Sequence, residues 1–194
     1  MYNLKSQLVL AILFLTIGTA TNAQSERTQF SLEIDPVTYV FKGFSIHARM
    51  TPKGSEHLLF GLGAYAMDMP NVLVNTNKLN RDEGWNSRLN QGYSFFFEYH
   101  FSEVNRKFFV GAQTGLQEYK ISNKNFEGDS KFTNYIAMAY LGYTIKPFKN
   151  NLYFKPWAGI GYTSQISGSN TLGTENYDIS PIAPFATFHV GYTF

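Results

Sequence analysis

Strict alternation of apolar and polar side chains is the feature that most constrains this chain. In "RLNQGYSFFFEYHF" (residues 88–101), one parity is aromatic and the other mixes small, polar and charged residues. A period of two places alternate side chains on opposite faces of a β-strand. The stretch is therefore predicted to be a strand whose bulky face holds Tyr93, Phe95, Phe97, Tyr99 and Phe101.

The same alternation recurs along the chain and predicts eight strands. They cover roughly residues 28–35, 42–51, 57–68, 88–101, 107–120, 133–146, 152–166 and 182–194. The faces of 57–68 are ambiguous. In 133–146 the favoured outward set is Tyr135, Ala137, Ala139, Leu141, Tyr143 and Ile145. Because a slip of one residue exchanges the two faces of a strand, the register of the first three strands and of the sixth stays open.

Connection lengths predict how these strands are arranged. Short connections at 51–56, 102–106 and 147–150 alternate with long polar ones at 69–87, 121–132 and 167–181. Outer-membrane barrels have short periplasmic turns and longer extracellular loops. The pattern predicts an all-β, eight-stranded, antiparallel up-and-down transmembrane barrel.

The N-terminal segment has the layout of a cleavable secretory signal. Lys5 precedes the apolar run Leu8 to Ile17, and small residues follow. This order is typical of a signal peptide, and ten apolar residues are fewer than the ~20 that a spanning helix needs. We predict a signal peptide over residues 1–23 and a barrel domain over 24–194, with cleavage after Ala23 or, as the alternative, after Ala20.

Composition narrows the function classes. The chain has 16 basic and 14 acidic residues, so its charge gives no case for nucleic-acid binding. It has no cysteine, so an exported form would have no disulfide. An exported, aromatic-rich chain without an apolar helix leaves two fold classes open, a membrane barrel or a soluble β protein in the periplasm.

The inward faces favour the membrane barrel with a lumen filled by side chains. Inferred inward positions pair glycines with large or charged residues, as expected where eight strands leave little interior space. Buried charges must be paired or hydrated. We therefore predict a structural polar network in the lumen, formed by Glu33, His47, Arg49, Glu98, His100, Lys155 and His189.

The terminal "FHVGYTF", together with the signal peptide and the alternating strands, resembles the small eight-stranded outer-membrane barrels of Gram-negative bacteria, the OmpA/OmpX/OmpW-like group. The Asn- and Tyr-rich composition points to a Bacteroidetes-type member. The resemblance implies that the barrel-assembly machinery reads a C-terminal aromatic signal, which maps here onto Phe188, Val190, Tyr192 and Phe194. It also implies outer-membrane lipid and lipopolysaccharide as surroundings.

The sequence leaves three chemical alternatives. His100 and Ser102 have the His-x-Ser spacing of some lipid A deacylase barrels, but the pair falls at a predicted periplasmic turn. His47, His100 and His189 lack the local spacing of a metal motif. A small-solute pore is the third alternative, although eight strands leave little room for a channel. No catalytic, metal or cofactor residue is assigned, and the chain is expected not to be an enzyme.

The long loops are the expected functional surface, because loops on a rigid scaffold commonly carry binding. The loop "PNVLVNTNKLNRDEGWN" contains Arg81 and Trp85, two residue types that are enriched in recognition surfaces. The alternative is that the apolar residues of the loop pack over the mouth of the barrel. The sequence thus predicts a porin-like envelope protein with a non-enzymatic structural or surface-interaction role.

Overall fold

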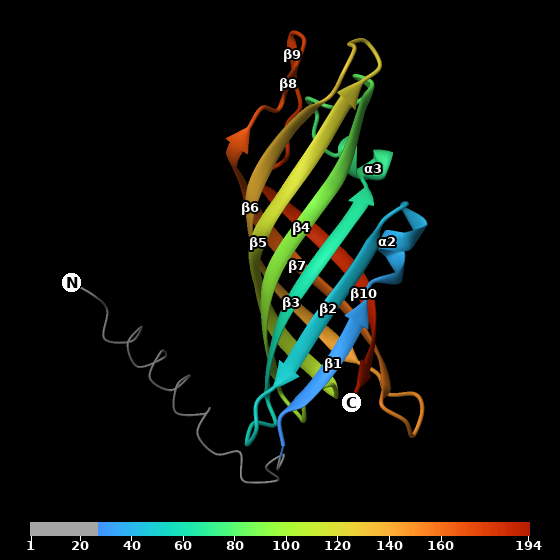
Figure 1. Cartoon of the computed structure of the whole chain (residues 1–194), viewed down its shortest axis with the longest axis vertical. Coiled ribbons are helices and arrows are strands. Elements are labelled where there is room, and N and C mark those ends of the chain that lie inside the picture. Colours follow the sequence, from blue (N-terminus) through green and yellow to red (C-terminus); the bar gives the residue numbers. More distant parts are fainter. Residues whose placement is uncertain (1–26) are drawn as a thin grey trace, which may run out of the picture.

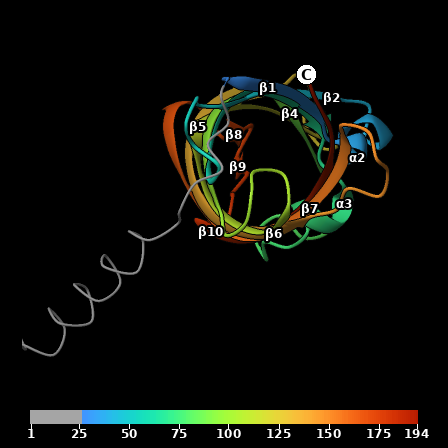
Figure 2. The ribbon, with the colours of Figure 1, turned by 90° about the horizontal axis from the view of Figure 1, so that it is seen from below.

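A computed structural model describes residues 27–194, so the predicted signal peptide lies outside the described residues. Within this range eight strands close into an antiparallel barrel with the order β1-β10-β7-β6-β5-β4-β3-β2. Figures 1 and 2 show the tilted strands and the ring that they form. The predicted fold class, an eight-stranded antiparallel barrel, is confirmed.

The strand bounds follow the alternation closely. They are β1 (Gln29–Ile34), β2 (Phe44–Thr51), β3 (Leu58–Asp68), β4 (Trp85–His100), β5 (Lys107–Asn123), β6 (Ser130–Thr144), β7 (Leu152–Gly168) and β10 (Ile182–Thr193). A small separate hairpin is formed by β8 (Thr171–Leu172) and β9 (Glu175–Asn176). The sixth strand has the favoured outward parity, since Leu141 is 61 % exposed and Tyr140 is buried.

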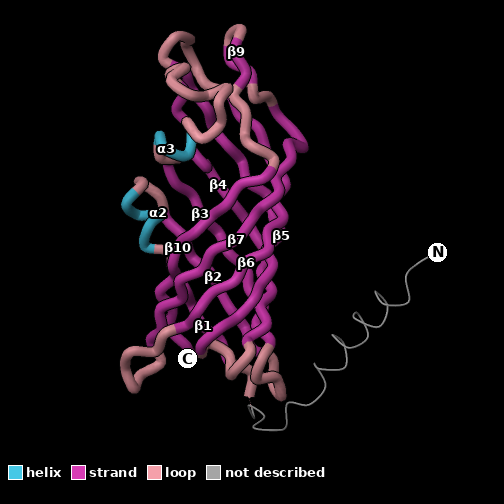
Figure 3. The backbone as a smooth tube through the Cα atoms, turned by 180° about the vertical axis from the view of Figure 1, so that it is seen from behind, coloured by secondary structure: helices cyan, strands magenta, loops and turns pink. Residues whose placement is uncertain are grey.

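The wall of the barrel has unequal height. Strands β4 to β7 rise far above β1 and β2 at one end, where β8 and β9 also lie (Figure 3). The prediction of a long loop over 121–132 is therefore wrong. The connection is shorter, because β5 continues to Asn123 and β6 begins at Ser130. Paired rings explain the extension, since Tyr119 and Phe132 stack with centroids 5.4 Å apart.

Two short helices, which the alternation did not predict, lie on one flank of the barrel (Figure 3). Helix α2 (Pro36–Val40) follows β1, and the Asp35 side chain accepts a hydrogen bond from the backbone N–H of Val37 at its start. Helix α3 (Asn71–Val74) follows β3. In the described range no helix is long and apolar enough to cross a membrane.

A bulge in β4 reverses the parity of that strand. Tyr65 pairs with Gly92 and Met67 with Leu89, so β4 carries one extra residue between these pairs. The pairing with β5 shifts at the same place, between Leu89 and Gln91. A bulge inserts a residue that is not matched on the partner strand. Side chains with even numbers therefore point inward below the bulge, and those with odd numbers do so above it.

Both strand prolines were expected near strand ends or bulges, because proline cannot donate to a ladder. Pro184 lies near the start of β10, as expected. The expectation for Pro156 is wrong, because it lies inside β7. There the regular pairing of β6 with β7 stops at Gly142 and Trp157, and a single bridge between Ile145 and Phe154 follows. The ladder breaks where the donor is missing.

Candidate functional site

The lower lumen holds a cluster of buried ionic side chains, here called the lumen network. It comprises the seven residues expected there, and all are at most 4 % exposed: Glu33, His47, Arg49, Glu98, His100, Lys155 and His189. They come from β1, β2, β4, β7 and β10. The alternation of those strands turns all seven side chains inward.

Glu33 is the centre of one half of the lumen network. Its carboxylate accepts hydrogen bonds from Arg49 Nε at 2.8 Å and from Lys155 Nζ at 2.9 Å. His189 Nδ1 lies 2.9 Å from the same carboxylate, and the Tyr153 hydroxyl donates to it at 2.8 Å. Four partners thus satisfy a carboxylate that is fully removed from solvent.

Glu98 is the centre of the other half. Lys155 Nζ also donates to Glu98 at 2.7 Å, so this ammonium bridges the two carboxylates. The Tyr140 hydroxyl donates to Glu98 at 3.1 Å, and His100 Nε2 lies 3.1 Å away. With two carboxylates, one guanidinium and one ammonium, the formal charges of the network cancel when its histidines are neutral.

Tyr140 and Tyr153 belong to the network but were not singled out in the sequence. A signal for them exists, because each faces a glycine on the neighbouring strand. Gly111 pairs with Tyr140, and Gly191 pairs with Tyr153. A Cβ at Gly191 would lie 2.3 Å from the Tyr153 ring. Glycine opposite a large inward side chain is therefore a steric requirement of this lumen.

The imidazole of His47 differs from the other side chains of the network because it makes ring contacts and no hydrogen bond to a described residue. Its ring stacks on His189 with centroids 4.6 Å apart and meets the edge of Phe96 at 5.2 Å. Its Nδ1 is buried without a partner. His47 and His189 form the upper surface of the network. Among the described residues, no group of three or more His, Cys, Asp or Glu side chains could hold a metal ion.

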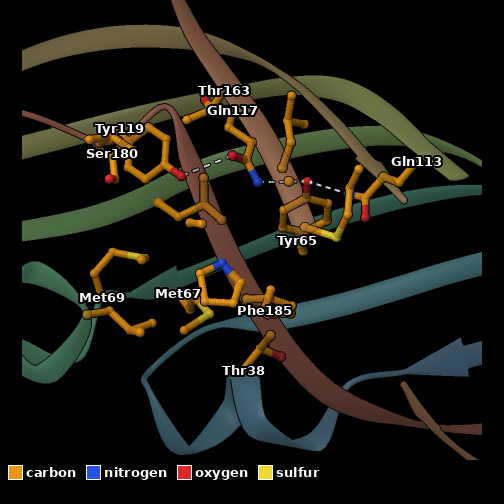
Figure 4. A pocket seen from close by; sticks show the side chains of 18 of the residues that line it. Thr38, Tyr65, Met67, Met69, Gln113, Gln117, Tyr119, Thr163, Ser180 and Phe185 are labelled. Carbon is orange, nitrogen blue, oxygen red and sulfur yellow. Dashed lines mark hydrogen bonds between the residues drawn. The ribbon is translucent and has the colours of Figure 1, made fainter. Parts of the chain in front are cut away.

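A cavity of about 290 Å³ lies above these two imidazoles. Its wall is mostly apolar and includes Met67, Met69, Phe96, Ile136, Met138, Trp157 and Phe185. Figure 4 shows Met67, Met69 and Phe185 around it, with Thr38 of α2 at its lower edge. Small-molecule sites are typically ~300–1,000 Å³ and largely apolar, so the cavity is at the small end of that range.

The polar side chains of the cavity wall mostly bond to one another. Gln113 and Gln117 both donate to the Tyr65 hydroxyl, at 3.2 and 3.1 Å, and the Tyr119 hydroxyl donates to Gln117 (Figure 4). Asn80 donates to the backbone carbonyl of Asp178 at 2.6 Å. Their hydrogen-bonding capacity is therefore largely used within the wall.

The loops pack over the top of the cavity as an apolar cap. This cap is the cluster Met67, Val74, Trp85, Leu89, Tyr119, Ile121, Phe132, Leu172 and Tyr177. Val74 comes from α3 and Leu172 from β8, so two loops contribute. Burial raises the pKa of the Tyr177 phenol above its ordinary value. Val74, Leu172 and Tyr177 of the loops thus pack over the mouth of the barrel, whereas Val72, Leu73 and Leu79 are exposed.

The expectation that Trp85 serves an exposed recognition surface is wrong. Trp85 begins β4, is 5 % exposed and packs edge-on against Tyr177 at 5.6 Å. The bulge further along β4 is the reason, because it reverses parity and turns this side chain inward. Arg81 is exposed in the β3–β4 loop, where its Nε donates to the carbonyl of Asn75.

The His100 and Ser102 pair does not form a catalytic arrangement. His100 is fully buried, bonds to Glu98 and lies beside Phe109. Ser102 lies in the turn after β4. The described contacts of the imidazole are therefore within the lumen network and not with this serine. The four outward residues of the expected C-terminal signal are on β10 or directly after it: Phe188, Val190, Tyr192 and Phe194.

Together these features define a closed eight-stranded barrel with a buried ionic network, an apolar cavity above it and a loop cap. No protein-family model and no curated protein matches the chain. Similar solved structures include the two that follow. The N-terminal β-barrel domain of Pseudomonas aeruginosa OprF has a TM-score of 0.42 and 14% identity, covering 88% of this chain and 99% of that one. Neisserial surface protein A has a TM-score of 0.38 and 11% identity, covering 86% of this chain and 94% of that one.

Proposed function

We propose that this chain is a barrel of the bacterial outer membrane with a plugged lumen and a non-enzymatic role, in envelope structure or in surface interaction through its loops. One observation carries the proposal, namely the inverted distribution of polarity. Lys155 and Glu33 are fully buried, whereas Leu62 is 65 % and Ile160 64 % exposed on the outer face. Large exposed apolar surfaces mark membrane or protein contacts.

The exposed apolar side chains surround the barrel and are not confined to one face. Six that lie on six different strands are Phe30, Ile46, Leu62, Phe97, Val110 and Leu141. An apolar outer belt around the barrel is what a bilayer requires, because the outward side chains contact hydrocarbon. A patch that binds a protein partner would require exposed apolar side chains on only one side of the barrel.

The alternation of short and long connections supports an orientation of the barrel in the membrane. The turns β2–β3, β4–β5 and β6–β7 are short and would face the periplasm, while the cap would face outward. The four outward aromatic and apolar residues of the last strand would serve the assembly machinery. The surrounding partners would be lipid and lipopolysaccharide. A soluble periplasmic barrel is the competing assignment.

The lumen network supports a plug rather than a pore. It ties strands on opposite sides of the lumen through Lys155, which bridges Glu33 and Glu98. In planar bilayers the purified protein is expected to give no discrete conductance. A reproducible unitary current would replace the plug with a small-solute pore.

Membrane insertion is tested by the mobility of the folded protein on an unheated gel. A closed membrane barrel should migrate faster before boiling than after it, and the protein should stay with the outer-membrane fraction. Recovery of a folded monomer from the soluble periplasmic fraction without amphiphile would refute the proposal.

The loop role is tested on exposed residues alone, because a deletion through Val74 or Trp85 would remove the cap. Val72→Ser, Leu79→Ser and Arg81→Ser should together reduce adhesion of expressing cells to matrix or host-cell surfaces. The matched control replaces exposed residues of the short-turn end, Lys53, Phe148 and Lys149. If both sets leave adhesion unchanged, a surface-interaction role of the β3–β4 loop is excluded.

A further inference from the structure

The wall of the barrel is incomplete beside the cavity. β1 pairs with β10 only through Val190 to Thr193. The upper part of β10, from Ile182 to His189, pairs with β7 along one edge and has no strand partner on the other among the described residues. Helix α2 occupies the place where β1 would have continued, and it packs against β2, β3 and β10.

The backbone groups of this free edge can be assigned. Phe194 N–H donates to Phe30 on the β1 side, whereas Thr193 N–H donates to Asn151 on the β7 side. Backbone groups alternate between the two edges of a strand, so the even-numbered residues 182–188 direct theirs to the free edge. Pro184 is one of them and has no N–H, which removes one donor that would lack a partner.

The free edge borders the cavity. Ala183, Pro184 and Phe185 of β10 line the cavity. Asp35 and Thr38 line it as well, and they face the free edge across a gap in the wall. Ala183 and Phe185 belong to the inward parity of β10, yet both are exposed. This combination is expected where the lumen opens sideways. The gap thus lies between upper β10 and the end of β3, above α2.

The gap opens at the height of the outer apolar belt. Ile182 and Tyr162 are paired across β10 and β7, and they are 65 % and 51 % exposed. Tyr39 and Val40 of α2 are also exposed, at 51 % and 76 %. The outer side of the gap is therefore bordered by apolar side chains, which in a membrane would face hydrocarbon, whereas the Thr187 hydroxyl donates to Asp35 at 2.7 Å at its lower end.

We propose that the cavity takes up a single acyl chain, which enters sideways from the bilayer through this gap. The inference rests on the proposed membrane location. An acyl chain fits because the wall is mostly apolar and its amides and hydroxyls are largely bonded to one another. Three methionines in the wall, Met67, Met69 and Met138, can adapt to a flexible chain. The His47–His189 pair closes the lower end and limits the depth of insertion.

The test uses the two tryptophans of the chain as reporters. Trp157 lines the cavity, 5.4 Å from Phe185 between ring centroids. In a Trp85→Phe variant it is the sole tryptophan. This variant is placed in vesicles of phosphatidylcholine brominated on one acyl chain, or in plain vesicles with brominated fatty acid. Bromine quenches tryptophan at short range, so loss of Trp157 fluorescence reports entry of a chain.

Two controls separate the possible failures. Ile160→Trp in a background without Trp85 and Trp157 places a reporter on the outer face and should be quenched by brominated lipid. Ala183→Phe fills the cavity and should abolish Trp157 quenching, whereas Ala186→Phe on the outer face of the same strand should preserve it. Each variant is first checked for the folded band on an unheated gel.

Each outcome decides the proposal. Quenching of Trp157 in either arm, relieved by Ala183→Phe, supports it, and the arm identifies the source as membrane phospholipid or free fatty acid. Quenching of the Ile160→Trp reporter without quenching of Trp157 overturns the cavity proposal and leaves the membrane location intact. If Trp157 is quenched but Ala183→Phe does not relieve the quenching, the cavity proposal is likewise overturned. An unquenched Ile160→Trp reporter overturns the membrane location, and this inference with it.

Discussion

The lower and upper halves of the lumen are built from many of the same strands but have opposite chemistry. Below, Glu33, Glu98, Arg49 and Lys155 are buried and joined by short hydrogen bonds. Above, Met67, Met138 and Phe185 surround a cavity of about 290 Å³. The lower half has all eight strands in its wall, whereas β1 ends below the upper half and leaves upper β10 without a strand partner on that side among the described residues. A complete wall accompanies the ionic plug, and an incomplete one accompanies the apolar cavity.

This difference indicates that the two halves stabilise the barrel by different means. In the lower half, paired charges hold opposite strands together, so each ion depends on its partners. In the upper half, contacts between apolar side chains are spread over strands and loops. Single substitutions should therefore be most costly in the plug, intermediate where glycine meets a large ring, and smallest in the cap.

The largest effect is expected from Glu33→Leu. This change leaves Arg49 and Lys155 with one fewer buried counterion, and removal of one partner from a buried ion pair costs ~3–5 kcal/mol. The free energy of unfolding is measured by urea titration in lipid vesicles, with the folded band on unheated gels as the readout.

The matched control for Glu33→Leu is Asp129→Leu, which removes the surface pair with Lys120, whose side chains are 42 % and 44 % exposed. Exposed pairs contribute ~0–1 kcal/mol. Equal losses for the two variants would contradict the assignment of the lumen network as the main electrostatic support of the barrel.

A smaller loss is expected from Gly191→Ala in the lower half. The new Cβ would lie 2.3 Å from the Tyr153 ring, which the bond to Glu33 holds in place. Overpacking of this kind typically costs ~1–3 kcal/mol. Gly161→Ala is the control in the upper half, where the nearest atom is the mobile end of Met138 at 3.0 Å. The same urea titration should show a smaller loss for Gly161→Ala, and the reverse order would remove the steric distinction between the halves.

The smallest of the three effects is expected in the cap. Val74 is 2 % and Val72 74 % exposed on the same short helix. Val74→Ala removes two buried carbon groups, which costs about 1.5 kcal/mol at ~0.8 kcal/mol per group. The β3–β4 loop should then be cleaved faster by trypsin at Lys78 or Arg81. Val72→Ala should leave the cleavage rate unchanged, and an equal acceleration by both would mean that the cap does not hold the loop.

Much of this barrel could be predicted from local patterns. Alternation between neighbouring residues located the strands, and it also selected the seven inward side chains that meet in the lumen network. Those predictions hold because the direction of a side chain in a strand depends only on its parity. Connection lengths indicated the antiparallel order for a similarly local reason, since short turns join adjacent antiparallel strands.

Other features were decided only by the pairing of strands. The extra residue in β4 reverses the parity and buries Trp85, and nothing in the alternation near "GWNSRLN" announces it. The early end of β1 leaves β10 with a free edge and places α2 in the wall. The sequence by itself determined which side chains face inward over most of each strand. The tertiary structure determined where the wall is open, because register and strand length depend on partners that are distant in the chain.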